Sequence, residues 1–180
     1  MPEPDRAEPE RSGPVFTDAD TWFASLPGVV VAAGALIVDR RDRVLLVKPN
    51  YRAMWSIPGG ICEFGEPPQI GCHREVAEEV GLDVAVGCLL AVDWSQPYGV
   101  DARPIMHLIF DGGRVDGGDG IVLQEAELDD YRFTAADELP AYLPSGGLAR
   151  VTAALRASTS ATTEFVPHPH PLRPAGPLGS

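Results

Sequence analysis

The sequence has few cysteines, few basic residues and no long apolar run. Its 180 residues include three cysteines, Cys62, Cys72 and Cys88, an odd number without the spacing of a zinc site. We therefore expect reduced thiols rather than disulfides or a zinc site. Lys and Arg total 14 against 26 Asp and Glu, which gives a formal net charge of −12. This acidity argues against a nucleic-acid duplex or an anionic membrane as a partner.

Targeting and membrane segments are also missing. The longest apolar run, residues 29–38, falls well short of the roughly 20 residues that a spanning helix requires. The N-terminal stretch "MPEPDRAEPERSGP" is acidic and proline-rich, without the basic-then-apolar order of a secretory signal. The sequence therefore predicts a cytoplasmic protein with no membrane partner.

Composition changes twice along the chain. Residues 1–25 are acidic and rich in proline, and few of them are large apolar residues that could offset the entropy of ordering. Residues 158–180 are rich in Ser, Thr, Pro and Gly. Both segments are expected to be tails, and residues 26–157 are expected to form one domain, as the length of the chain also favours.

Strands are predicted from β-branched runs between the tails. Residues 29–39 and 43–49 are two such runs separated by a polar turn, which is typical of a hairpin. Further strands are predicted at residues 82–94, 105–110 and 128–133.

Two helices are predicted as well. In the first, residues 68–80, Pro67 and Pro68 suit a first turn and Gly81 suits a left-handed cap. The second covers residues 147–158, where apolar side chains recur at i, i+3 and i+7, namely Leu148, Val151 and Leu155. Because strands and helices do not alternate strictly, the sequence predicts an α+β fold with a mixed sheet.

The first helix carries a cluster of glutamates. Glu75, Glu78 and Glu79 lie at i, i+3 and i+4 and share one helix edge, whereas an apolar stripe is expected from Ile70, Ala77 and Val80. Two such charges about 6 Å apart repel by roughly 3 kcal/mol at an effective dielectric near 20. A solvated acidic face is the ordinary interpretation of the cluster alone. A divalent cation would turn the repulsion into attraction, and carboxylate oxygens suit Mg²⁺ or Mn²⁺.

The loop before this helix favours the cation interpretation. Gly59 and Gly60 would let backbone groups approach a ligand without obstruction. Glu66 lies near the positive end of the helix dipole, and Arg74 stands four residues before Glu78, where it can orient a carboxylate. Loop and helix together are a plausible cradle for a metal and a diphosphate.

These residues resemble the Nudix box, G-x5-E-x7-R-E-U-x-E-E-x-G-U with U an aliphatic residue. The sequence matches every fixed position, through Gly60, Glu66, Arg74, Glu75, Val76, Glu78, Glu79, Gly81 and Leu82. The resemblance extends more loosely over about residues 28–157, through the order of the strands and the C-terminal helix.

The resemblance implies a Nudix hydrolase, an α/β/α sandwich that uses Mg²⁺ or Mn²⁺ to cleave a nucleoside diphosphate linked to another moiety. Glu75, Glu78 and Glu79 would be metal ligands and catalytic residues, with the Gly60 carbonyl as a further ligand. Glu66 and Arg74 would brace them. The substrate would be a small nucleotide: a nucleotide sugar, a nucleoside triphosphate or a dinucleoside polyphosphate.

A further glutamate outside the box often joins the site in this family. Glu127, six residues before Phe133, is the first choice for that role and Glu125 the second, with an ordinary acidic turn as the alternative for both. The general base differs among family members and is not assigned.

Substrate-binding residues are less sharply indicated. Lys48, Arg52 and Arg103 could hold phosphates, with a solvated surface role as the alternative. Aromatic side chains could stack a base or simply pack: Tyr51, Trp55, Trp94 and Tyr98. Pro97 resembles the mark of ADP-ribose-cleaving members and the adjacent Tyr98 that of members cleaving diadenosine polyphosphates, so the two marks conflict.

Two other functions on the same scaffold stay open. One is a nucleotide sensor without catalysis, which is disfavoured because all the box glutamates are kept. The other is an isoprenyl diphosphate isomerase, for which Cys62 would be the only candidate nucleophile. Trp22 and Phe23 could seal a homodimer, although covering the domain's own core is the favoured role.

Overall fold

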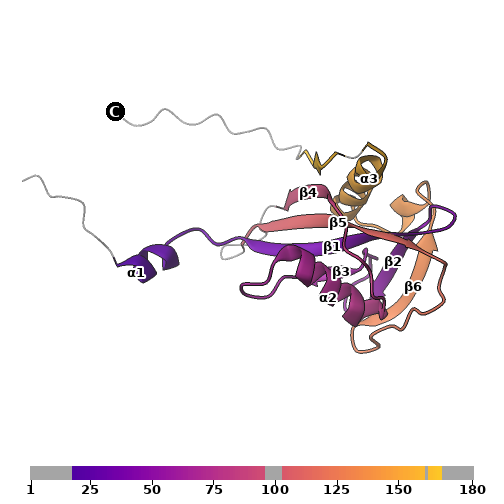
Figure 1. The fold of residues 1–180 in the computed structure, drawn as a ribbon, viewed down its shortest axis with the longest axis horizontal. Helices are drawn as coiled ribbons and strands as arrows, with labels where there is room; N and C mark the ends of the chain where they lie inside the picture. The colour runs from indigo at the N-terminus through magenta and orange to yellow at the C-terminus, as the bar shows by residue number, and fades with distance from the viewer. Residues whose placement is uncertain (1–17, 96–102, 161, 168–180) are drawn as a thin grey trace, which may run out of the picture.

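A computed structural model describes residues 18–95, 103–160 and 162–167. These residues form a sheet with helices on both faces, α2 on one and α3 on the other (Figure 1). In chain order the elements are α1 (Ala19–Ala24), β1 (Val30–Asp39), β2 (Val44–Pro49), β3 (Gly59–Ile61), α2 (Pro68–Val80), β4 (Leu89–Ser95), β5 (Ile105–Val115), β6 (Leu128–Thr134), a short 3-10 turn η1 (Leu139–Ala141), α3 (Ser145–Ser160) and β7 (Glu164–Phe165). The expected sandwich, with a mixed sheet between helices, is confirmed.

The sheet is organised around β1. Its strand order is β6-β2-β1-β5-β4-β7, and β3 pairs with β1 outside this path. The β1–β5 and β4–β7 pairs are parallel, and the other pairs are antiparallel. Since β1 carries β2, β3 and β5 as partners, it brings the loop before α2 into contact with the middle of the sheet.

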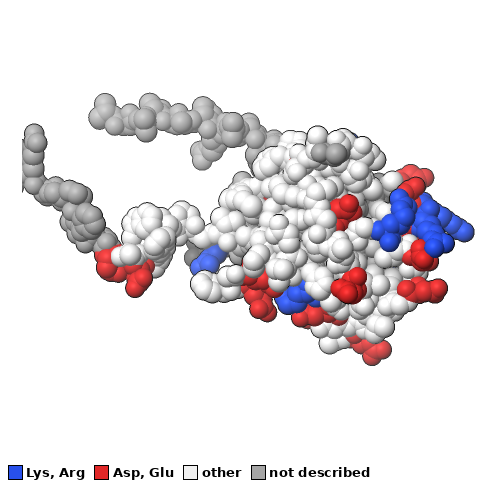
Figure 2. All heavy atoms as spheres, in the orientation of Figure 1, with Lys and Arg blue, Asp and Glu red and all other residues white. Residues whose placement is uncertain are grey.

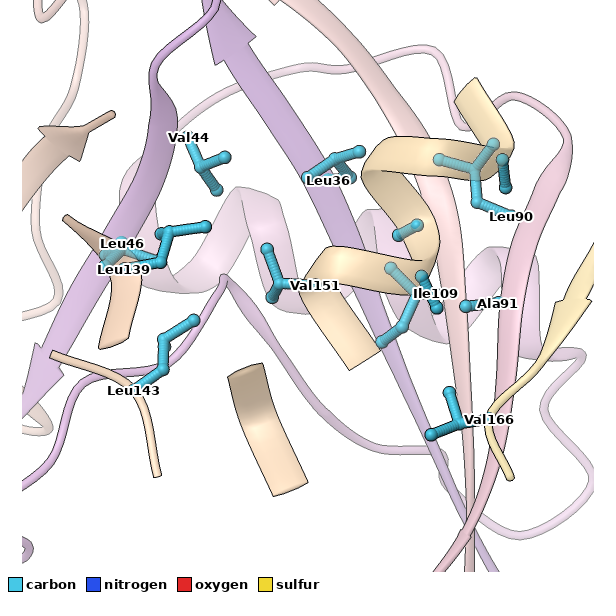
Figure 3. Packing of buried hydrophobic residues seen from close by; sticks show 13 residues of the cluster. Leu36, Val44, Leu46, Leu90, Ala91, Ile109, Leu139, Leu143, Val151 and Val166 are labelled. Atoms are coloured by element: carbon cyan, nitrogen blue, oxygen red, sulfur yellow. The ribbon is translucent and has the colours of Figure 1, made fainter. Parts of the chain in front are cut away.

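Each face of the sheet packs one half of the core. Under α3 the buried residues include Leu36, Leu46, Ile109 and Val151 (Figure 3). Under α2 the buried residues include Val76, which belongs to α2 itself. Because β-strand side chains alternate between faces, successive residues of β1 serve both halves.

The predicted hairpin and both predicted helices are confirmed. The strand expected at residues 82–94 is wrong over its first half, because β4 begins only at Leu89. Leu82, Val84 and Val86 do alternate toward the core beneath α2, but no strand among the described residues pairs with them. An alternating apolar pattern shows which side chains are buried, but a β-strand also needs a neighbouring strand to which its backbone can hydrogen-bond.

The apolar face of α2 is another correction. Ile70 is 58% exposed and Ala77 is exposed, so they do not form the buried stripe. The stripe consists instead of Cys72, Val76 and Val80, at i, i+4 and i+8. The cysteines of the described chain are free, as expected.

Ordered elements occur within both segments that were expected to be tails. Helix α1 stands apart from the sheet and buries none of its residues (Figure 1). At the other end β7 pairs with β4, and Val166 is 6% exposed beneath α3. The division into one domain and two tails stays a prediction, but the packed part extends at least to Val166.

Charge is unevenly spread over the face shown in Figure 2. Basic side chains gather at the right-hand end, and acidic ones are scattered along its lower edge. Two ion pairs join strand-end loops, Arg40 with Asp116 and Arg114 with Asp42.

Among the described helices, none combines the length and the apolar character needed to cross a membrane.

Candidate active site

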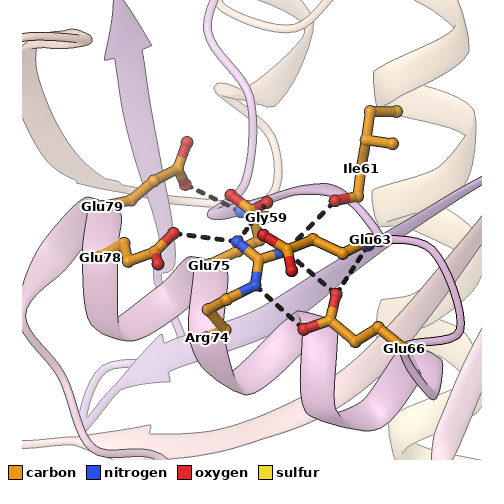
Figure 4. Close-up of polar contacts among 8 residues, drawn as sticks. All are labelled: Gly59, Ile61, Glu63, Glu66, Arg74, Glu75, Glu78 and Glu79. Carbon is orange, nitrogen blue, oxygen red and sulfur yellow. Dashed lines mark hydrogen bonds and ion pairs between the residues drawn. The ribbon is translucent and has the colours of Figure 1, made fainter.

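The site is built on the edge of α2 that faces β3 (Figure 4). Pro67 and Pro68 start the helix, where a missing N–H is harmless, and Gly81 ends it in the left-handed conformation with φ 68°. Because both ends of α2 are fixed in this way, its three glutamates have fixed positions along the helix axis.

Two glycines of β3 bring backbone against the carboxylates. Gly59 N donates a 2.8 Å hydrogen bond to Glu79 Oε2. A Cβ added at Gly60 would lie 2.5 Å from Glu75 Cδ, closer than side-chain atoms tolerate. The close approach of strand to helix therefore requires glycine at position 60.

Arg74 ties the acidic side chains together. Its Nε and Nη2 donate to the two oxygens of Glu66 at 3.0 and 3.1 Å, and its Nη1 donates to Glu75 and Glu78 at 3.0 and 2.9 Å. The guanidinium and the Glu63 N–H lower the pKa of Glu66. Glu66 and Arg74 are thus bonded to each other beside the α2 glutamates, and their role in bracing metal ligands stays a prediction.

Burial raises the pKa of two carboxylates of the cluster, Glu75 and Glu79. Glu79 is 8% exposed, and its desolvation, with the nearby charges of Glu75 and Glu127, raises its pKa to about 7. Desolvation also raises the pKa of Glu75, although Arg74 opposes the shift. Without a cation, Glu79 is therefore partly protonated near neutral pH.

Glu127 lies close enough to act on Glu75 and Glu79, since its charge raises the pKa of both. Its loop is attached to the end of α2, where Val122 N donates to Val80 O and Gln124 N donates to Glu79 O, each at 3.0 Å. No contact between Glu125 and the cluster is found among the described residues.

The donor set fits a hard divalent cation. Glu75, Glu78, Glu79 and the Gly60 carbonyl supply only oxygen, the preference of Mg²⁺ and Mn²⁺. Over the described residues, no three acidic, His or Cys side chains are already arranged around one point. One oxygen of Glu75 and one of Glu78 accept from Arg74, and a cation could take the second oxygen of each carboxylate while these bonds remain.

A cleft of about 290 Å³ begins at the same two glycines. Its floor is β1 and β5, and its walls come from the β2–β3 loop, β3 and α3; the lining residues are Ala32, Ala33, Gly34, Tyr51, Arg52, Ser56, Ile57, Gly59, Gly60, Ile61, Ile105, His107, Ile109 and Arg150. The predicted ligand residues Arg52 and Tyr51 are therefore beside the cleft.

The other predicted substrate residues lie elsewhere. Lys48 Nζ donates to the carbonyls of Pro49 and Arg52 at 2.8 and 2.7 Å, which fixes the loop. Trp55 packs edge-on against Tyr142 and lines a smaller neighbouring hollow. Arg103 is exposed next to Gly28.

Two aromatic candidates remain. Trp94 lies on β4, opposite Met106 of β5. Tyr98, like Pro97, falls outside the described residues.

Sequence analysis missed a polar group that borders the cleft. Arg150 Nη1 donates to Asp93 Oδ2 at 2.7 Å, and Asp93 is 2% exposed. Asp93 pairs in register with His107, whose pKa burial and Arg150 lower to about 4. The available signal was a polar residue within each of two apolar strand runs, "LLAVDWS" and "IMHLIF".

Comparison with known proteins places this geometry in a family. The family model described as NUDIX domain matches residues 28–155. YjhB of Bacillus subtilis (strain 168), by its name a candidate ADP-ribose pyrophosphatase, is 32% identical over 108 residues, 59% of this chain and 51% of that protein. An ADP-ribose pyrophosphatase of Methanocaldococcus jannaschii is 31% identical over 101 residues, 52% and 58% of the two chains. The chain thus spans about half the length of such relatives.

Solved structures agree on the fold. A crystal structure of UDP-X diphosphatase superposes with a TM-score of 0.65 at 21% identity and covers 83% of this chain and 75% of the other. An ADP-ribose pyrophosphatase from Streptococcus suis 89-1591 superposes with a TM-score of 0.57 at 26% identity, covering 76% and 96%.

Proposed function

Because the chain belongs to the NUDIX domain family, we propose that it hydrolyses the pyrophosphate bond of a nucleoside diphosphate linked to another moiety. The substrate class that we favour is nucleotide sugars, since relatives named ADP-ribose pyrophosphatase are among the similar proteins. Nucleoside triphosphates and dinucleoside polyphosphates are the other substrates to be tested. The cytoplasmic location and the homodimer remain predictions.

One observation carries the proposal: the cleft and the carboxylates meet at Gly59 and Gly60. Both glycines line the cleft, and the same two residues touch Glu79 and Glu75. A ligand in the cleft would therefore present its nearest group to the acidic edge of α2. A phosphate is the group that would be stabilised there, because it can share a divalent cation with the carboxylates.

The residues would divide the work as follows. Glu75, Glu78 and Glu79, with the Gly60 carbonyl, would hold Mg²⁺ or Mn²⁺, which supplies neutralisation of phosphoryl charge and a more acidic water. Glu127 would add a fourth carboxylate near the reacting phosphate. Arg74, fixed by Glu66, would orient Glu75 and Glu78, so that their oxygens stay on the side of β3.

The test is product analysis. The purified chain is incubated with Mg²⁺ and a panel of ADP-ribose, UDP-glucose, nucleoside triphosphates and diadenosine polyphosphates, and the products are separated by chromatography. We expect release of a nucleoside monophosphate or pyrophosphate, and Glu78→Gln is expected to reduce turnover by orders of magnitude while thermal unfolding stays unchanged.

Glu125→Gln is the matched control, because Glu125 is an exposed glutamate of the same acidic surface. It should retain turnover. Binding without any product would favour a sensor, and conversion of isopentenyl diphosphate without phosphate release would favour an isomerase. Full activity of Glu78→Gln would remove that residue from the site.

A further inference from the structure

Small side chains make the floor of the cleft. On β1, Ala32 and Gly34 lie on the α3 side, as does Leu36, which is buried in the core beneath that helix. Ala32 is half-buried, whereas Gly34 is buried, because a Cβ there would lie only 3.3 Å from Ile57 Cδ1. Their register partners on β5 are His107 and Ile109. Of these four residues only Ala32 and His107 are half-buried, so the part of the floor that is open to a planar ring lies over this pair.

An ion-paired polar group borders this floor. Asp93, His107 and Ala32 pair in register across three strands, β4, β5 and β1. The Arg150 guanidinium lies over this row, bonded to Asp93 at 2.7 Å and in longer contact with Ser95 Oγ at 3.4 Å. The charges of Arg150 and Asp93 cancel, and His107 is uncharged near neutral pH.

Arg150 keeps donors for a ligand. A guanidinium has five N–H donors in a fixed plane, and among the described residues the contacts of Arg150 with Asp93 and Ser95 use only Nη1. The side chain of Arg150 is 19% exposed and borders the cleft. Because Asp93 holds it, the guanidinium is pre-organised and loses little freedom on binding.

The other arginine of the cleft has a different environment. Arg52 Nη2 donates to a neutral hydroxyl, Ser56 Oγ, at 2.9 Å, and the side chain is exposed. Its charge also acts on Glu79, so it lies toward the acidic end. An exposed cation hydrogen-bonded to a neutral partner, beside the acidic edge, suits a phosphate.

We propose that Arg150, held by Asp93, is a specificity-determining residue that donates hydrogen bonds to the nucleobase of the substrate, with His107 beside it. This deepens the proposed function and rests on it for the direction of the substrate: phosphates at Arg52 and the α2 glutamates, base over Ala32 and beside Arg150. A base offers uncharged oxygen and nitrogen acceptors, which match donors whose net charge is already cancelled.

A phosphate is the weaker candidate for the Arg150 end. Binding it there would set a second negative charge close to the buried Asp93 carboxylate, and like charges at short range in a desolvated site repel strongly. A sugar could accept the same hydrogen bonds but would not use the flat apolar floor.

The experiment measures binding, so that it can be read even if hydrolysis fails. Affinities for AMP, GMP, CMP, UMP and ribose 5-phosphate are measured by calorimetry with Mg²⁺ present. In the unaltered chain at least one nucleotide should bind ten times more tightly than ribose 5-phosphate. Arg150→Lys keeps the charge but loses the planar fork, and it should remove most of that preference. Arg52→Lys should weaken all five ligands by a similar factor.

Arg156→Lys is the matched control, since Arg156 lies on the same helix but pairs with Glu164 away from the cleft. It should leave every affinity unchanged. If Arg150→Lys does not fold, the double variant Asp93→Asn with Arg150→Gln keeps a neutral hydrogen-bonded pair and should lose the preference in the same way.

Three results would overturn the inference: no preference in the unaltered chain, a preference that survives both variants, or equal weakening of ribose 5-phosphate and nucleotides by Arg150→Lys. Selective binding without hydrolysis would contradict the proposed hydrolase activity but would support the role of Arg150 in nucleobase binding. Hydrolysis with unchanged selectivity in the variants would support the hydrolase activity and contradict the role of Arg150.

Discussion

At the scale of single residues, Gly60 is one of two glycines that the site closely constrains, beside Gly59, where a Cβ would lie 2.3 Å from Ala33 O. A methyl group at position 60 would lie 2.5 Å from the Glu75 carboxyl carbon, so Glu75 must move. We expect Gly60→Ala to lower kcat/KM by about 100-fold, because a displacement of about 1 Å can cost that much when geometry controls the reaction. Steady-state kinetics with saturating Mg²⁺ measures the change.

Gly146 provides the comparison for that variant, because an added Cβ would meet only Arg150 Nη1, at an ordinary van der Waals distance. Gly146 lies in the first turn of α3, and a Cβ there would meet nothing closer than 3.6 Å. Gly146→Ala should leave kcat/KM within a factor of two or so, as expected for a substitution that displaces no functional group. If Gly60→Ala behaved in the same way, the close approach of β3 to α2 would have no catalytic meaning.

Glu79 makes the stability of the metal-free protein depend on pH. Its pKa in the folded chain is about 7, against 4.5 for an ordinary glutamate, because the carboxyl is buried. The folded state therefore holds its proton more tightly than the unfolded state between these values. Stability from this group is present below pH 4.5 and is lost as the pH rises to about 7.

The measurement is urea unfolding in EDTA at several pH values, for the unaltered chain and for Glu79→Gln. The free energy of unfolding of the unaltered chain should fall relative to that of the variant across the window from 4.5 to 7, and the difference should then level off. Asp39 and Glu66, whose pKa values are lowered, are present in both chains and cancel. If the free energy of unfolding changed with pH in the same way in the unaltered chain and in Glu79→Gln, Glu79 would not be desolvated.

At the scale of elements, local signals located α2 well. Its first turn was fixed by Pro68, which the helix accepts only at its start, and its end by Gly81. The buried side of the helix was predicted less well, since Ala77 is exposed and Cys72 is buried. Which side faces the sheet depends on where β1 and β2 lie, and a helix sequence alone carries little information about that.

Gly81 gives a direct test of how α2 ends. Its φ of 68° lies in the left-handed region, and a Cβ there would approach Val122 to 3.1 Å. Gly81→Ala should lower the free energy of unfolding by about 1 to 2 kcal/mol, the cost of that conformation for a residue with a side chain. Chemical unfolding measures it. Gly81→Asn should lose less, because asparagine tolerates the same conformation, and equal losses would point to the Val122 contact instead.

At the scale of the whole molecule, the site joins residues that are far apart in sequence. The box predicted Glu66, Arg74 and the α2 glutamates because they are close along the chain. Arg150 and Asp93 are separated by 57 positions, and their contact exists only because α3 lies over β4. A single sequence carries no signal for such a pair, whereas Glu127 was predicted only through the family resemblance.

The same scale decides where the folded domain ends. Val166 N donates to Val92 O at 2.8 Å, and the Val166 side chain is 6% exposed, whereas Phe165 beside it is 64% exposed. If β7 belongs to the domain, Val166→Ala should lower the free energy of unfolding by about 1.5 kcal/mol, near 0.8 kcal/mol for each buried carbon removed. Phe165→Ala removes the larger side chain but should change it by less than about 0.5 kcal/mol. Thermal or urea unfolding distinguishes them, and two equally silent variants would return residues 158–180 to the status of a tail.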